Sequence, residues 1–164
     1  MQHILHSASR GLKTIHDCNC IHGDIKSHNL LINKDIATSK YSCAWGDLGG
    51  AIFLTDTQEK TNIEQGTSGW TAPEIFTGGG YNLSADIFSF GMVMCDASSI
   101  GGFTNKLIGL ENDKYVEAVK MGHMPGLHHD GTGIAELIEY CWRLNPRKRP
   151  SADQVERRLA GETP

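Results

Sequence analysis

A short stretch of the chain, residues 21–29, brings together side chains with complementary chemistry. It holds a carboxylate at Asp24, an ammonium group at Lys26 and an amide at Asn29. Phosphoryl transfer needs a group that orients a hydroxyl, a charge that offsets phosphate and a metal ligand. A second carboxylate, Asp47, lies in a Gly-Asp-Leu-Gly sequence and could reach the same metal ion. Oxygen ligands suit Mg²⁺, which keeps waters and substrate phosphates in the rest of its shell, so the pattern indicates magnesium-dependent phosphoryl transfer.

Hydrophobic periodicity predicts the elements that must position these side chains. Apolar residues recur at helical spacing over residues 2–17, and two short apolar runs at 30–32 and 41–45 predict a small hairpin. Residues 46–74 are polar and almost without periodicity, which predicts a long functional loop. Ser84 can cap a helix that continues to about residue 97. This helix is apolar on nearly every side, so it belongs in the core.

Three further helices complete the expected architecture. The first starts at Asn112 or Asp113 and ends near Gly122, and the second covers residues 134–142. The third covers about 151–160, where Ser151 opens a capping box. The predicted fold class is therefore mainly α (α+β), a helical unit with one small β-hairpin. The 164 residues fit one domain, or one lobe of a larger domain.

Composition excludes several classes of function. A net charge of −4 does not suit a nucleic-acid binder, and the longest apolar run, 90–95, is far below the roughly 18 residues of a membrane span. Residues 1–10 lack the features of a secretory signal. The five scattered cysteines form no C-x-x-C pair and predict free thiols in a reducing, cytoplasmic setting.

Six short motifs follow one another along the chain. They are His22-Gly23-Asp24 with Lys26 and Asn29, Asp47-Leu48-Gly49, Gly66 to Thr71, Ala72-Pro73-Glu74, Asp86 to Gly91, and Cys141-Trp142 with Asn145-Pro146 and Arg149-Pro150. In this order they resemble the motifs of the eukaryotic-type protein kinases, and the chain is identified as a member of that superfamily. The last motif resembles the closing signature of the tyrosine-kinase-like group of serine/threonine kinases.

The resemblance implies a role for each matching residue and implies ATP and Mg²⁺ as the cofactors. Lys26 and Thr67 match the serine/threonine preference, so the implied partner is a protein substrate with a Ser or Thr hydroxyl. The implied roles are orientation of the hydroxyl by Asp24, contact with the transferring phosphate by Lys26, magnesium ligation by Asn29 and Asp47, and a floor beneath adenine from Leu31.

Other matching positions are structural by the same resemblance. Glu74 and Arg149 are expected to form an ion pair, because a buried carboxylate needs a partner. Asp86, on an otherwise apolar helix, is expected to brace the backbone of the catalytic loop, and His22 belongs to this structural group.

The resemblance covers the C-terminal lobe only. It assigns residues 1–164 to that lobe, with the catalytic loop at 21–29 and the activation segment at 47–74. The family's N-terminal β-lobe supplies a Gly-rich loop, a strand Lys and a helix Glu, and the 23 residues before Asp24 contain none of them. The N-terminal β-lobe is therefore expected to be absent from this chain and to act in cis or in trans.

Two departures from the family pattern stand out. Gly23 occupies the position where most kinases have Arg, which removes the charge-assisted bond that a phosphorylated activation loop would form. Asp47 follows Asn29 by 18 positions, longer than the family usually allows. Either the hairpin turn near residues 34–40 is lengthened, or a change of register separates Asp47 from the site.

Three functions remain open from the sequence. The first is a protein serine/threonine kinase that is incomplete as given, and the second is a stand-alone, non-catalytic C-lobe that binds proteins. The third is a helical metal-binding protein that uses the histidines His123, His128 and His129.

Overall fold

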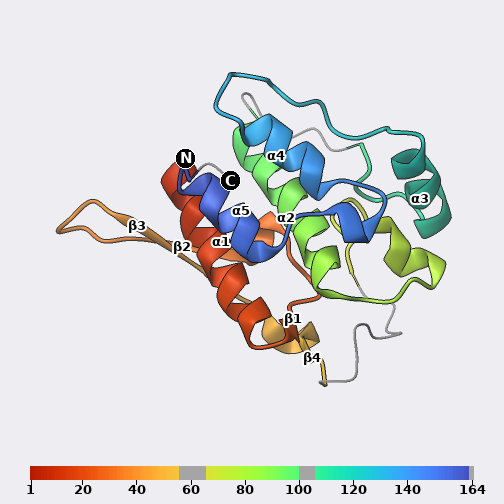
Figure 1. The fold of residues 1–164 in the computed structure, drawn as a ribbon, viewed down its shortest axis with the longest axis horizontal. Coiled ribbons are helices and arrows are strands. Elements are labelled where there is room, and N and C mark those ends of the chain that lie inside the picture. The colour runs from red at the N-terminus through yellow and green to blue at the C-terminus, as the bar shows by residue number, and fades with distance from the viewer. Residues whose placement is uncertain (56–65, 100–105, 163–164) are drawn as a thin grey trace.

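The structure is a computed structural model that describes residues 1–55, 66–99 and 106–162. It confirms the mainly helical architecture, with helices grouped on one side of a projecting β-hairpin (Figure 1). The α-helices are α1 (Gln2–Asp17), α2 (Leu83–Ser98), α3 (Asn112–Lys120), α4 (Ile134–Cys141) and α5 (Ala152–Leu159). Short 3₁₀ turns are η1 (Ser27–Asn29), η2 (Leu48–Gly50), η3 (Pro73–Thr77) and η4 (Pro146–Lys148).

Helix α2 is the centre of the core, as its apolar sequence predicts. Every residue from 85 to 95 is buried, including the carboxylate of Asp86. The expectation that Ser84 caps this helix is wrong. Asn82 is the N-cap, because its extended backbone lets the side-chain oxygen accept from the Ser84 amide at 3.0 Å.

The remaining helices pack around α2 and α1. Helix α4 lies against α2, and α1 lies against α5 and the hairpin. Contact between α2 and α4 is close at Gly91, where an added Cβ would stand 2.8 Å from the Cβ of Cys141. Burial at this contact raises the pKa of the Cys141 thiol to about 12. All five cysteines are free.

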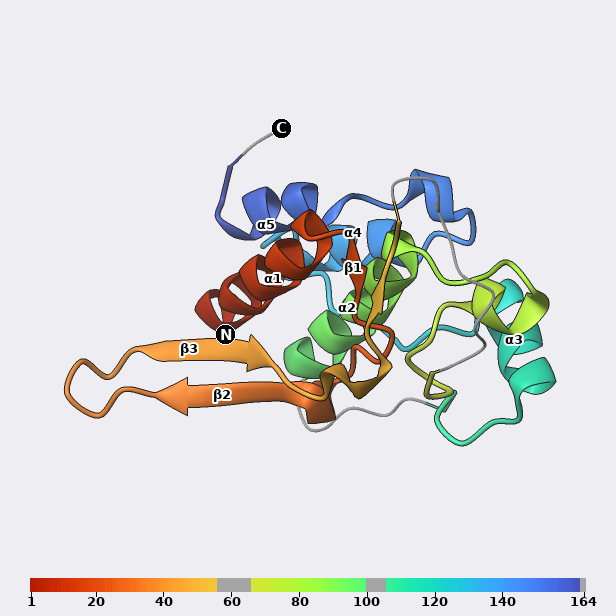
Figure 2. The same cartoon turned by 90° about the horizontal axis from the view of Figure 1, so that it is seen from below.

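Strands β2 (Leu30–Lys34) and β3 (Tyr41–Trp45) form the predicted hairpin, which projects from the body in Figure 2. Their antiparallel register runs from the Leu30–Trp45 pair to the Lys34–Tyr41 pair. The Asp35 amide then donates to the Lys40 carbonyl at 2.9 Å, closing a turn over 35–40. The additional residues between Asn29 and Asp47 are therefore accommodated by a lengthened hairpin.

A second two-stranded sheet was not predicted from the sequence. Strand β1 (Cys20–Ile21) pairs with β4 (Ile52–Phe53) in antiparallel orientation. The predicted loop 46–74 therefore contains a strand near its start. Its middle, residues 56–65, lies outside the described residues. In the part of the chain that the structure describes, no helix has the length and apolar character needed to cross a membrane.

The capping box at Ser151 is present as predicted. The Ser151 hydroxyl accepts from the Gln154 amide, and the Gln154 side chain accepts from the Ser151 amide at 2.9 Å. Gly161, at a φ of +84°, follows the end of this last helix.

Candidate active site

The 21–29 loop is fixed to the core through its backbone. The amides of His22 and Gly23 donate to the two carboxylate oxygens of Asp86, at 2.8 and 3.0 Å. The Tyr81 hydroxyl donates to the Gly23 carbonyl at 2.7 Å. The loop therefore depends on α2 and on the segment just before it, which are more than 55 positions away in the sequence.

Asp86 is fully buried, so its charge needs several donors. A third donor is the Nε2 of His16, which lies 3.0 Å from Oδ2 at the end of α1. Helix α1, the 21–29 loop and α2 therefore meet at one carboxylate.

His22 connects the loop to the residue that precedes Asp47. Its Nδ1 accepts from the Asp24 amide at 3.3 Å, and its Nε2 donates to the Gly46 carbonyl at 3.0 Å. Both bonds require the neutral ring with its proton on Nε2, because an amide can only donate and a carbonyl can only accept. The ring is fully buried, which fixes its position.

Asp24 is the centre of a network of four side chains. Lys26 Nζ lies 2.6 Å from its Oδ2, and the Thr67 hydroxyl donates to its Oδ1 at 3.1 Å. Asn29 Nδ2 donates to the same Oδ2 at 3.1 Å and to the Asp24 carbonyl at 2.9 Å. Lys26 Nζ is also 3.4 Å from the Thr67 hydroxyl. The structure thus brings together Asp24, Lys26 and Asn29, and adds Thr67 from a segment some 40 residues later.

These donors determine the charge of Asp24. Partial burial raises the pKa of the carboxyl, but the hydrogen bonds from Lys26 and Thr67, the Lys26 charge and the Asn29 amide outweigh burial. The pKa of Asp24 therefore lies below its ordinary value. The carboxylate is ionised at neutral pH and acts as a hydrogen-bond acceptor.

The hairpin register determines where Asp47 lies relative to Asn29. The Gly46 amide donates to the Asn29 carbonyl at 2.9 Å, one step beyond the Leu30–Trp45 pair. Gly46 therefore lies opposite Asn29, and Asp47 is the next residue along the chain. Its side chain is exposed and its φ is +58°.

The donor set of Asn29 and Asp47 fits Mg²⁺. Because the Asn29 Nδ2 is used by Asp24, its Oδ1 is the group left for a ligand, and no hydrogen bond within the described residues uses it. Nor does any ion pair within those residues involve the carboxylate of Asp47. One amide oxygen and one exposed carboxylate match a cation that keeps several waters and takes its remaining ligands from phosphates.

Leu31 lies at the base of the hairpin with a side chain that is 61% exposed. It covers Gly46, where an added Cβ would stand 3.2 Å from the Leu31 Cδ1. Its neighbour Ile32 is 52% exposed but lies on the opposite face of the hairpin, because successive side chains of a strand point to opposite faces.

Comparison with known proteins decides the family. The family model described as protein tyrosine and serine/threonine kinase matches residues 1–159. The chain belongs to the protein kinase family. A probable serine/threonine-protein kinase of Dictyostelium discoideum is 34% identical over 90% of this chain, and the tyrosine-protein kinase Fgr of Rattus norvegicus is 28% identical over 90%. The RGS domain-containing serine/threonine-protein kinase A of Dictyostelium discoideum is 30% identical over 91%.

This kinase chain spans only a part of those relatives. It covers 10% of the first Dictyostelium kinase, 12% of the RGS domain-containing kinase and 28% of Fgr. The relatives include both serine/threonine and tyrosine kinases, so the family membership alone does not specify the hydroxyl that is phosphorylated.

The Glu74–Arg149 ion pair joins the Ala-Pro-Glu motif to the last part of the kinase chain. It is bidentate, with Nη1 2.5 Å from Oε1 and Nη2 2.9 Å from Oε2. The Arg149 side chain is completely buried and also donates to the Ser84 and Arg143 carbonyls. Four of its five N–H donors are therefore used inside the protein, which gives it a structural role.

Gly23, the departure from the kinase pattern, has a backbone that favours glycine. Its φ is +81°, and an added Cβ would stand 3.0 Å from the Gly50 carbonyl oxygen. Any side chain at this position has to accept a left-handed backbone and a close carbonyl. No side chain at 23 is available to meet a phosphate on the activation segment.

The histidine cluster does not form a metal site. Within the described ranges, no group of three or more His, Cys, Asp or Glu side chains could hold a metal ion. His129 instead lies 3.7 Å from each of the exposed carboxylates Glu136 and Glu139.

Sequence reasoning missed two residues that support the kinase loop, His16 and Tyr81. His16 follows the core residue Leu12 at helical spacing, so its position on the buried face of α1 could have been recognised. Tyr81 lies between a glycine run and α2, and no periodic pattern indicates that it is buried.

Proposed function

We propose that this chain is the C-terminal lobe of a serine/threonine protein kinase domain, covering residues 1–164. It transfers the γ-phosphoryl group of ATP, with Mg²⁺, to a Ser or Thr hydroxyl of a protein. The supporting observation is the network in which Lys26 and Thr67 both contact the Asp24 carboxylate. Sequence resemblance associates these two residue types with serine/threonine kinases.

In this proposal Asp24 orients the substrate hydroxyl and accepts its proton as the oxygen attacks the γ-phosphorus. Lys26, already beside Asp24, offsets the charge of the transferring phosphoryl group. The bond from the γ-phosphorus to the bridging oxygen breaks and ADP leaves. Asn29 and Asp47 would hold Mg²⁺, which neutralises phosphate charge when bound.

The nucleotide site also needs an N-terminal lobe, in cis or in trans. That lobe supplies the Gly-rich loop, strand Lys and helix Glu that cover the ATP phosphates in this family. The exposed side chain of Leu31 supports the proposal, because an apolar side chain at the hairpin base is suited to contact with a second lobe and with adenine.

The test is phosphoryl transfer by this chain with a kinase N-terminal lobe fused ahead of Met1. The fusion is first shown to bind MgATP by thermal shift, and is then offered peptides that differ only in a central Ser, Thr or Tyr. We expect Ser and Thr peptides to be phosphorylated and the activity to fall by about 10³-fold or more in Asp24→Asn. Asp113→Asn, which changes an exposed carboxylate on α3, is the matched control and keeps full activity.

Two results would contradict the proposal. Preference for the Tyr peptide would refute the serine/threonine assignment. A fusion that binds MgATP but shows no Asp24-dependent transfer would instead favour the non-catalytic, protein-binding reading of the lobe.

The isolated chain gives a second, simpler measurement. We expect MgATP to produce no appreciable thermal stabilisation, because half of the nucleotide site is missing. A ligand at a hundred times its dissociation constant would add about 2.7 kcal/mol, which is readily detected. A clear shift that is lost in Asp47→Ala would show that the lobe binds nucleotide unaided.

A further inference from the structure

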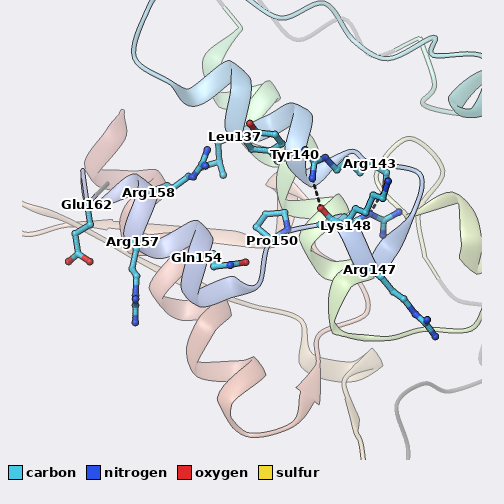
Figure 3. A pocket seen from close by; sticks show the side chains of 11 residues that line it. Leu137, Tyr140, Arg143, Arg147, Lys148, Pro150, Gln154, Arg157, Arg158 and Glu162 are labelled. Atoms are coloured by element: carbon cyan, nitrogen blue, oxygen red, sulfur yellow. Dashed lines mark hydrogen bonds between the residues drawn. The ribbon is translucent and has the colours of Figure 1, made fainter. Parts of the chain in front are cut away.

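Helices α4 and α5 lie on the other side of the molecule from the β2–β3 hairpin (Figure 2). A basic groove lies between α4, η4 and α5. We use the name basic groove for this cavity of about 590 Å³. Figure 3 shows side chains from both helices and the connecting segment around it. Its charged lining residues are Arg143, Arg147, Lys148, Arg149, Arg157, Arg158 and a single carboxylate, Glu162.

Most of the positive charge of the basic groove is not neutralised by the protein. Arg149 is paired with Glu74, and Arg157 with Asp153 at 3.0 Å. Within the described residues, the other four cations of the groove have no carboxylate within ion-pair distance; they are Arg143, Arg147, Lys148 and Arg158. This concentration of charge occurs in a chain whose net charge is −4.

Tyr140 holds two of these cations in place. The guanidinium carbons of Arg143 and Arg158 lie 4.4 and 4.9 Å from the centre of its ring. Arg143 also donates to the Lys148 carbonyl at 2.9 Å (Figure 3). Side chains fixed in this way lose little conformational entropy when a ligand binds, so the groove is preorganised for an anion.

We propose that the basic groove binds an acidic peptide segment of a partner protein. Carboxylates of the peptide would pair with the unneutralised cations, and an apolar side chain would lie against Pro150. The volume lies within the range of about 300–1,000 Å³ that is usual for ligand sites. This binding is separate from phosphoryl transfer, because no residue of the Asp24 network lines the groove.

The shape and surface of the groove favour a peptide over other anions. Tyr140 is engaged by two guanidinium groups, so it does not offer a ring on which a nucleic-acid base can stack. The cations line a concavity rather than a flat or convex face, which suits an extended chain better than a membrane surface.

The test is binding of a short fluorescein-labelled peptide of Glu residues with one central Leu, followed by fluorescence anisotropy on the whole chain. We expect binding at about 0.05 M salt that weakens steeply by about 0.3 M salt. The double variant Arg147→Glu/Lys148→Glu should weaken binding by about tenfold or more. Both residues are exposed, and a thermal melt verifies that the variant is folded.

The matched control is Lys40→Glu/Lys120→Glu, which changes the net charge equally at exposed sites outside the groove and should alter binding less than about twofold. Arg158→Gln, a milder change within the groove, should also weaken binding. Equal weakening by the two double variants, or no peptide binding at low salt, would overturn the proposal. Binding to phosphatidylserine vesicles that is lost in Arg147→Glu/Lys148→Glu, together with no binding of the peptide, would overturn it in favour of a lipid surface.

Discussion

Replacing Asp86 with Asn should destabilise the protein and loosen the 21–29 loop. Asp86 is fully buried and its two oxygens accept three hydrogen bonds, from the amides of His22 and Gly23 and from His16. Asn preserves the size of the side chain but has one oxygen and one donor. In its better orientation the oxygen faces His22 and His16, and the new amino group faces the Gly23 N–H.

The cost follows from those contacts. An unsatisfied buried donor costs about 1–3 kcal/mol, and bonds to a neutral oxygen are each weaker by roughly 1 kcal/mol than bonds to a carboxylate. Removing a buried charge offsets part of the loss. We therefore expect Asp86→Asn to lower the free energy of unfolding by about 3 kcal/mol, or Tm by about 6–12 °C.

Urea denaturation measures this free energy, and amide hydrogen exchange measures the loop. Exchange at His22 and Gly23 should accelerate more than exchange in the middle of α2. Glu117→Gln, an exposed change of the same kind on α3, should shift stability by less than about 0.5 kcal/mol. A loss below about 1 kcal/mol in Asp86→Asn, with unchanged exchange at the two loop amides, would refute the idea that this carboxylate holds the loop.

Three further changes have calculable directions. Gly23→Ala should lower the free energy of unfolding, measured by urea denaturation, more than Gly78→Ala does. Both glycines have φ near +80°, so either substitution costs about 1 kcal/mol in backbone strain, but only an alanine at 23 also meets a carbonyl oxygen. Equal losses of stability in the two variants would contradict this. Gly91→Ala should lower the free energy of unfolding by about 1–3 kcal/mol, although Ala favours helices, because the added methyl group would collide with α4. A stabilised variant would show that α2 and α4 can move apart at little energetic cost. Folding lowers the pKa of Asp24, so the stabilising effect of its carboxylate is complete above the ordinary Asp pKa of about 3.9. That effect is lost as the pH falls through the folded-state pKa. The difference in free energy of unfolding between wild type and Asp24→Asn should therefore be constant from about pH 6 to 8 and shrink in acid.

The helices were predictable because each has a local signal. Helix α1 shows apolar residues at helical spacing, α2 is apolar on all sides, and the α5 capping box is written in four consecutive residues. Strands β1 and β4 have only two residues each, too few to show alternation, and their pairing joins segments about 30 positions apart. The N-cap of α2 was assigned to Ser84 instead of Asn82 because both residue types cap helices, and only the backbone conformation distinguishes them.

The candidate site was predictable in part and for a different reason. The resemblance to kinases named Asp24, Lys26, Asn29 and Asp47, but spacing alone does not reveal that Thr67 joins them. That contact depends on a long chain excursion returning to the loop. The position of Asp47 relative to Asn29 likewise depends on the hairpin register. The structure shows this register, whereas the 18-residue separation in the sequence left it open.

The buried contacts that hold the 21–29 loop predict what a second lobe would contribute to nucleotide binding. Asp86, Tyr81 and His22 all lie in this chain, and each is buried, so the loop conformation depends on the core of the lobe and not on a nucleotide. Adding an N-terminal lobe should therefore create nucleotide affinity without changing hydrogen exchange at Gly23. If exchange at Gly23 slowed markedly only when the second lobe and MgATP were both present, the loop would be ordered by its ligand, and the buried Asp86 contacts would be insufficient to hold it.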